Sequence, residues 1–161
     1  MLIHPPIRVS HTYRQSLDGT PGDVLPLLCP VREAEWVPGW DPRLVLSSSG
    51  FVERDCIFLT PDSAAGPDAE AIWTVLEFDR EGGRVEMLKV TPGFLVVRLS
   101  IVLHPRDGGS HADVTYAYTA LGPDGEAFVR SRTAEAYAEF MRGWEGALNA
   151  YLRTRREAPA R

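Results

Sequence analysis

Two tryptophans in the first quarter of the chain are candidates for contact with a ligand. Trp36 and Trp40 stand four residues apart, and Pro38 and Gly39 between them force the chain out of a helix. Either the indole rings gate the mouth of a pocket and touch its ligand, or they anchor the loop against the rest of the protein. The sequence leaves both interpretations open.

Two pairs of polar aromatic residues occupy alternate positions in predicted strands, so each pair shares one side of its strand. His11 and Tyr13 form the first pair, and Tyr116 and Tyr118 form the second. If these sides line a pocket, the side chains can orient a ligand or transfer a proton. Otherwise each is a core residue with a hydrogen-bond partner of its own.

Arg98 interrupts a segment that is otherwise apolar or small. A buried arginine needs a carboxylate partner, and Glu77 and Glu86 on neighbouring segments are candidates. Alternatively, Arg98 faces a pocket and binds a ligand carboxylate with its planar guanidinium, or it faces solvent. Both sides of this strand are largely apolar, so its alternation does not choose among the three.

Four further titratable residues are of types that occur in reactive sites, but their spacing does not point to one. Glu33 and Glu35 are candidates for acid–base chemistry, yet short helices usually expose such residues, so we expect solvated carboxylates. His104 and His111 flank a predicted turn and are expected to face each other as an exposed pair. A zinc site needs three or four ligands, and the sequence offers no third.

Composition limits the possible functions. The 161 residues fit one domain, and a net charge of −5 disfavours nucleic acid or an anionic membrane as a partner. We find no signal peptide and no apolar stretch long enough to span a bilayer. Cys29 and Cys56 are expected to be buried free thiols, which indicates a cytoplasmic protein.

The apolar spacing predicts an antiparallel sheet that follows a short helical region. We expect a half-buried strand over 7–17 and short helices over 21–28 and 31–36. The later strands are joined by turns of a few residues, which cannot make parallel crossovers. Their expected ranges are 44–48, 50–54, 55–60, 71–79, 84–91, 94–105 and 111–121.

The C-terminal segment predicts one long amphipathic helix, which extends toward Phe128. Gly143 and Gly146 each cost about 1 kcal/mol relative to alanine, so the helix depends on packing against the sheet. The glycines either permit close approach to the sheet or leave room for a ligand beside Trp144. The apolar stripe consists of Tyr137, Phe140, Met141, Trp144, Ala147, Leu148, Tyr151 and Leu152.

The element order, the run 31–42 with its two tryptophans, and the strand 116–120 followed by a long helix carry a family resemblance. The chain resembles the START-like (SRPBCC) superfamily, in particular its polyketide cyclase/dehydrase-like bacterial members. The resemblance implies an α+β helix-grip fold: a curled antiparallel sheet of about seven strands with two short helices and a long C-terminal helix packed across it. It implies a single domain over 1–161, with 1–5 and 154–161 flexible.

A helix laid across a curled sheet leaves space between the two. We therefore predict that the protein binds a small hydrophobic or amphipathic molecule there, as a monomer or homodimer, without a cofactor, metal, nucleic acid or membrane insertion. Two alternatives stay open: an aromatase/cyclase- or dehydratase-like enzyme with unassigned catalytic residues, and a protein-interaction module of the chaperone-regulating type. The predicted ligand-binding residues are His11, Tyr13, Trp36, Trp40, Trp73, Arg98, Tyr116, Tyr118, Phe140 and Trp144.

Overall fold

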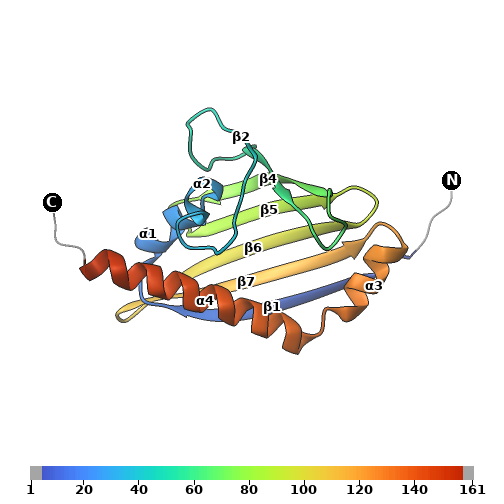
Figure 1. Ribbon diagram of the computed structural model, residues 1–161. Helices are drawn as coiled ribbons and strands as arrows, with labels where there is room; N and C mark the ends of the chain where they lie inside the picture. The colour runs from blue at the N-terminus through green and yellow to red at the C-terminus, as the bar shows by residue number, and fades with distance from the viewer. Residues whose placement is uncertain (1–4, 158–161) are drawn as a thin grey trace.

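The computed structural model describes residues 5–157, and seven strands in them form one antiparallel sheet (Figure 1). The order across the sheet is β1-β7-β6-β5-β4-β3-β2, so the first strand in the chain pairs with the last. The predicted antiparallel sheet is confirmed. The strands are β1 (Arg8–Leu17), β2 (Leu44–Leu46), β3 (Ile57–Pro61), β4 (Glu70–Asp79), β5 (Arg84–Thr91), β6 (Leu95–Arg106) and β7 (Gly109–Ala120).

Segment 50–54 was predicted to be a strand, and this prediction was wrong. Gly50 has a φ of +76°, which a strand does not accommodate. The Glu53 carboxylate accepts the backbone N–H groups of Ser48 and Ser49, so it stabilises a loop between β2 and β3. The local apolar pattern did not reveal this side-chain cap.

The short helices α1 (Pro21–Val24) and α2 (Pro30–Glu33) follow β1, with a 3-10 turn at Leu25–Leu28 between them. Thr20 caps α1 through a reciprocal pair of hydrogen bonds with Asp23, which is a capping box. Both predicted short helices are therefore confirmed. They lie over one end of the sheet (Figure 1).

The C-terminal region forms two helices, α3 (Pro123–Ser131) and α4 (Ala134–Glu157), where one extended helix was expected. Thr133 separates them: its hydroxyl accepts the Ala136 N–H at 3.1 Å and so starts α4. Of the end expected to be flexible, residues 154–157 continue α4, whereas 158–161 and 1–4 lie outside the described residues. No helix within 5–157 is long and apolar enough to cross a membrane.

Helix α4 lies along the β1 edge of the sheet, and Figure 1 shows it crossing β1 and β7. Gln15 donates to the Met141 carbonyl at 3.1 Å, and the Ser16 N–H donates to Glu145 at 2.8 Å. Tyr137 donates to the Val114 carbonyl of β7 at 2.7 Å. Because these bonds hold α4 over the β1–β7 side, the helix does not cover the inner face of β4 to β6.

The two glycines of α4 have neither role that the sequence suggested. Gly143 and Gly146 are both exposed, and a Cβ added to either would have no non-local atom within 4 Å. They therefore point to solvent, away from both the sheet and the space beside Trp144. The two thiols agree with the prediction, because Cys29 and Cys56 are buried and free.

Candidate functional site

A cavity of about 520 Å³ lies between the inner face of the sheet, α2 with the loop that follows it, α3 and α4. This volume is within the range of small-molecule sites. Its apolar floor comes from alternate positions of β5 and β6, whose side chains point to one face. These floor residues are Met87, Leu95, Val97 and Leu99.

Aromatic rings form one wall of the cavity. Phe58 and Trp73 stack with their ring centroids 5.5 Å apart, and Trp40 meets Trp73 edge-on at 6.2 Å. The Trp40 Nε1–H donates to the Pro30 carbonyl at 2.6 Å, which fixes this indole against α2. Trp40 and Trp73, both predicted as site residues, therefore line the cavity.

Trp36 does not line the cavity, which corrects its predicted role. Its indole is buried, and Nε1–H donates to the Leu27 carbonyl at 2.9 Å. The ring also packs edge-on against Trp144, with the centroids 5.4 Å apart. Trp36 thus anchors the loop, whereas Trp40 faces the cavity.

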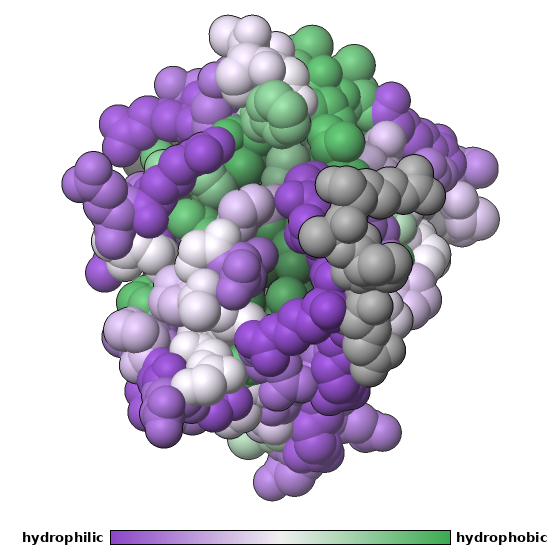
Figure 2. All heavy atoms as spheres, turned by 90° about the vertical axis from the view of Figure 1, so that its left-hand side faces the viewer, coloured by the Kyte–Doolittle hydropathy of each residue, from purple (hydrophilic) through white to green (hydrophobic). Residues whose placement is uncertain are grey.

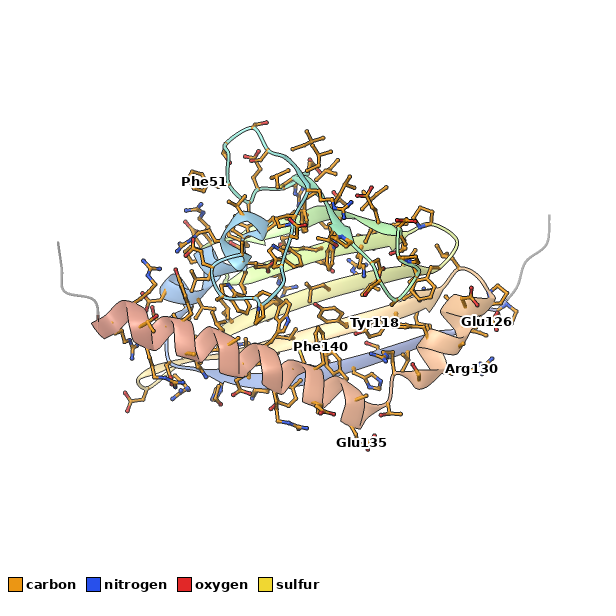
Figure 3. All side chains as sticks on the ribbon, viewed as in Figure 1. Phe51, Tyr118, Glu126, Arg130, Glu135 and Phe140 are labelled. Carbon is orange, nitrogen blue, oxygen red and sulfur yellow. The ribbon has the colours of Figure 1, made fainter. Side chains whose placement is uncertain are left out.

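The mouth of the cavity lies between α4 and the loop after α2. Phe140 lines the cavity yet is 43% exposed, and Trp144, one turn further along α4, is partly buried. Their ring centroids lie 5.9 Å apart. Figure 3 shows Phe140 directed from α4 toward the sheet and Tyr118 beside it, and both of these predicted ligand-binding residues line the cavity.

The phenol hydroxyls of Tyr116 and Tyr118 line the cavity without a hydrogen-bond partner among residues 5–157. Their ring centroids lie 5.7 Å apart on β7. Burial raises the pKa of Tyr118 to about 12 and that of Tyr116 well above its ordinary value, so both stay neutral near pH 7. The two hydroxyls are free to bond a guest molecule.

Glu33 is buried in the cavity wall, and the prediction that it is solvated was wrong. It lies three residues after Pro30 and three before Trp36, so it shares their buried side of the segment. Its carboxyl has no hydrogen-bond partner in the described chain, and burial raises its pKa to about 8. Glu35, by contrast, is exposed as expected, and its ion pair with Arg32 at 2.9 Å lowers its pKa to about 2.

Two cationic residues of the cavity were missed by the sequence interpretation. Lys89 lies on the same face of β5 as the buried Val85 and Met87, and its Nζ lies 2.8 Å from a carboxylate oxygen of Asp62. Arg132 lies in the short connection between α3 and α4. Its guanidinium carbon is 4.4 Å from the Phe128 ring centroid, and its buried Nε has no partner in the described chain.

His11 and Tyr13 were predicted to lie in the pocket, but neither lines it. The His11 Nε2–H donates to the Arg132 carbonyl at 2.7 Å, and Tyr13 donates to Glu145 of α4 at 3.2 Å. Both side chains point to the inner face of β1. Because α4 and the α3–α4 connection cover that strand, they act as structural contacts there.

Arg98 lies on the outer face of the sheet, which corrects its predicted place in the site. Its side chain is 59% exposed and pairs with Glu86, one of the two expected carboxylates. Its neighbours Val97 and Leu99 point inward to the cavity, so the alternation of β6 sends Arg98 outward. His104 and His111 face each other across β6 and β7, as predicted for that pair.

A second group of exposed apolar side chains lies outside the cavity. Leu44 and Leu46 of β2 and Phe51 of the next loop are 44%, 54% and 60% exposed. Figure 1 places β2 and this loop at the top of the molecule, and Figure 2 shows apolar surface gathered at the same level. The protein-interaction alternative would depend on this surface.

Comparison with known proteins identifies the fold. No family model matches the sequence, and no curated protein matches it significantly. Norcoclaurine synthase from Thalictrum flavum, solved in complex with dopamine and hydroxybenzaldehyde, superposes with a TM-score of 0.66 at 11% identity. The match covers 97% of this chain and 91% of that one. The chain has the helix-grip fold.

Two further solved structures agree with this assignment. The Mll3558 protein from Rhizobium loti matches with a TM-score of 0.64 at 15% identity, over 92% of this chain and 99% of that chain. Ara h 8.0201 matches with a TM-score of 0.61 at 14% identity, over 91% of this chain and 99% of that one. At these identities the likeness establishes the fold alone.

Proposed function

We propose that this protein binds a small hydrophobic or amphipathic molecule in the cavity between its sheet and α4. The observation that carries the proposal is an apolar cavity of about 520 Å³ whose wall holds polar groups without partners in the described chain. Buried polar groups normally have hydrogen-bond partners, and leaving one unpaired costs about 1–3 kcal/mol. A ligand with matching groups would recover that energy. The helix-grip fold supports the same conclusion.

A neutral fluorescent probe tests the proposal directly. N-phenyl-1-naphthylamine should bind the wild-type protein at one site, with increased emission. Val97→Phe places a ring into the cavity floor and should weaken the probe at least tenfold. Val96→Phe adds the same volume on the other side of β6 and should leave binding unchanged. Circular dichroism would verify that both variants fold. Equal probe binding by both would contradict a cavity site.

The enzyme alternative also has support, from Glu33. A carboxyl with a pKa of about 8 can donate or accept a proton near neutral pH. We propose that the cavity, if catalytic, removes a proton next to a ligand carbonyl. α-Tetralone deuterated beside its carbonyl should then lose deuterium to water faster with wild type than with Glu33→Gln. Equal loss from the two proteins would exclude Glu33 as the base.

The remaining assignments are proposals of smaller scope. The run 31–42 favours the polyketide cyclase/dehydrase-like branch of the superfamily. The buried free thiols, Cys29 and Cys56, favour a cytoplasmic location. For the oligomeric state we propose a monomer or homodimer, which light scattering would distinguish.

A further inference from the structure

Arg132 is held at one end of the cavity by contacts with its backbone and its side chain. Its carbonyl accepts the His11 Nε2–H at 2.7 Å, which ties the α3–α4 connection to β1. Its guanidinium stacks on Phe128 of α3, with 4.4 Å between the guanidinium carbon and the ring centroid. Both Arg132 and Phe128 line the cavity. The guanidinium is therefore positioned before any ligand arrives.

The charge of Arg132 is not balanced by the described part of the protein. Within residues 5–157, no carboxylate oxygen lies within the 4.0 Å of an ion pair with Arg132, and its buried Nε has no hydrogen-bond partner. The cavity's other cation is balanced, because Lys89 pairs with Asp62 at 2.8 Å. Arg132 is partly buried, and its Nε–H group is removed from water without an acceptor, which is costly. The missing partner is one that a ligand can supply.

Glu33 enters the cavity from α2, and Figure 1 places α2 and α3 toward opposite ends of the sheet. Between them, Tyr116 and Tyr118 present their unpartnered phenols from β7. A protonated Glu33 carboxyl both donates and accepts hydrogen bonds. The cavity thus offers a cation at one end, two phenols along its length and a neutral acid at the other end.

We propose that the ligand is a hydrophobic organic acid whose carboxylate binds Arg132 and whose far end carries a hydroxyl or carbonyl group that bonds to Glu33. The body of the ligand lies on the apolar floor beside Tyr118. This inference rests on the proposed function, because it assigns the ligand class to the same cavity. The planar fork of arginine binds a carboxylate with two parallel hydrogen bonds, which gives both affinity and orientation.

The test displaces bound N-phenyl-1-naphthylamine with three bicyclic probes: 2-naphthamide, 2-naphthoate and 6-hydroxy-2-naphthoate. The amide is neutral, the naphthoate adds the carboxylate, and the third adds a hydroxyl at the far end. We expect 2-naphthoate to bind at least tenfold more tightly than 2-naphthamide at pH 7. We expect 6-hydroxy-2-naphthoate to bind a further three- to tenfold more tightly.

Variants assign each gain to a residue. Arg132→Gln should abolish the preference for 2-naphthoate over 2-naphthamide while keeping the amide affinity. Glu33→Leu should abolish the gain from the hydroxyl and keep the carboxylate preference. Arg130→Gln is the matched control: Arg130 has the same charge, lies on α3 two residues away, and is 69% exposed with only a long 3.9 Å contact to Glu126. Figure 3 shows Arg130 and Glu126 on the outer side of α3.

The outcomes separate this inference from the proposed function. If the fluorescent probe binds but naphthoate and naphthamide compete equally, the cavity binds ligands and the organic-acid assignment is wrong. If Arg132→Gln and Arg130→Gln lost naphthoate affinity equally, the preference for the carboxylate would come from long-range electrostatics. That result would also overturn the assignment. If no probe binds, both proposals fail.

Discussion

The inner face of the sheet has two halves, and polar residues behave differently in each. In the half where α4 packs on β1, the polar side chains of β1 that face the helix have bonded partners, and so does Tyr137 of the helix. His11 bonds to the α3–α4 connection, Tyr13 and Gln15 bond to α4, and Tyr137 bonds from α4 to β7. These groups stabilise the position of the helix, and nothing remains for a ligand to bond.

In the other half, around the cavity, Lys89 and Asp62 pair with each other, but four further polar residues keep groups without partners in the described chain. Glu33, Tyr116 and Tyr118 face the cavity without hydrogen bonds, and Arg132 has an unpartnered Nε. Both halves contain tyrosines and charged groups at alternating strand positions. Residue type therefore does not separate structural polar groups from those available to a ligand. The presence or absence of a hydrogen-bond or ion-pair partner within the protein does.

The largest expected effect comes from Glu33, in the half of the inner face that surrounds the cavity (the hollow half, as opposed to the packed half beneath α4). Burial raises the pKa of its carboxyl from 4.5 to about 8, so the folded protein holds a proton that the unfolded chain releases. The contribution to stability is therefore complete below about pH 4.5 and is lost as the pH rises toward 8, by on the order of 4 kcal/mol. In urea unfolding, the free energy of unfolding of Glu33→Gln should equal that of wild type at pH 5 and be higher than that of wild type at pH 8.

Nearby groups do not mask this effect. Tyr116 and Tyr118 face the same space from β7 and stay neutral through this pH range, since burial raises the pKa of both. Arg132 and the Lys89–Asp62 pair are the other charged groups of the cavity wall. Glu35→Gln is the control: the pKa of Glu35 is about 2 in the folded protein and 4.5 in the unfolded chain, so its charge changes little between pH 5 and 8 in either state. If the difference in the free energy of unfolding between wild type and Glu33→Gln did not change with pH, the Glu33 carboxyl would be solvated in the folded protein.

The next comparison uses adjacent residues of α4 that belong to the two halves. Met141 is 0% exposed against the sheet, whereas Phe140 is 43% exposed at the cavity mouth. Met141→Ala should lower the free energy of unfolding by roughly 2–5 kcal/mol, and Phe140→Ala by less than about 1 kcal/mol. Affinity for N-phenyl-1-naphthylamine should fall more in Phe140→Ala than in Met141→Ala. If the two variants were equally destabilised in urea, the mouth would be closed by tight packing.

A smaller effect distinguishes the tyrosines. Tyr137→Phe removes the 2.7 Å hydrogen bond to the Val114 carbonyl and should cost roughly 1–2 kcal/mol. Tyr118→Phe removes a hydroxyl that has no partner among residues 5–157, so the stability of the variant should stay within about 0.5 kcal/mol of wild type. Thermal unfolding at pH 7 measures both. A loss for Tyr118→Phe as large as that for Tyr137→Phe would show that the Tyr118 hydroxyl is bonded in the folded protein.

Local patterns in the sequence predicted most of the elements, and their order predicted a cavity between the sheet and the C-terminal helix, but no local pattern gave its position beside that helix. The alternation in β1 and the helical spacing of α4 are local and were interpreted correctly. The hollow exists because α4 is tied to β1, and β1 pairs with β7, as in Arg8 with Thr119. That pairing joins the two ends of the chain, and no local pattern encodes it.

The site residues show the same limit. Glu33 carried a signal, since it is spaced three residues from Pro30 and from Trp36, but the usual exposure of short helices outweighed it. Arg98 and Lys89 both interrupt apolar strands, but Arg98 lies between the inward Val97 and Leu99 and so points outward, whereas Lys89 pairs with Val97 and points inward. Arg98, which was predicted for the site, therefore faces outward, and Lys89, which was not predicted, faces the cavity.

The smallest effect tests whether the packed half can be strengthened without altering the hollow half. Gly146 lies on the exposed side of α4 with open space around its Cβ position. Gly146→Ala should therefore raise the free energy of unfolding by roughly 0.5–1 kcal/mol, because alanine loses less backbone entropy in a helix. Affinity for N-phenyl-1-naphthylamine should not change. If the variant altered probe affinity, α4 would have to move during binding, and the packed half would be part of the site.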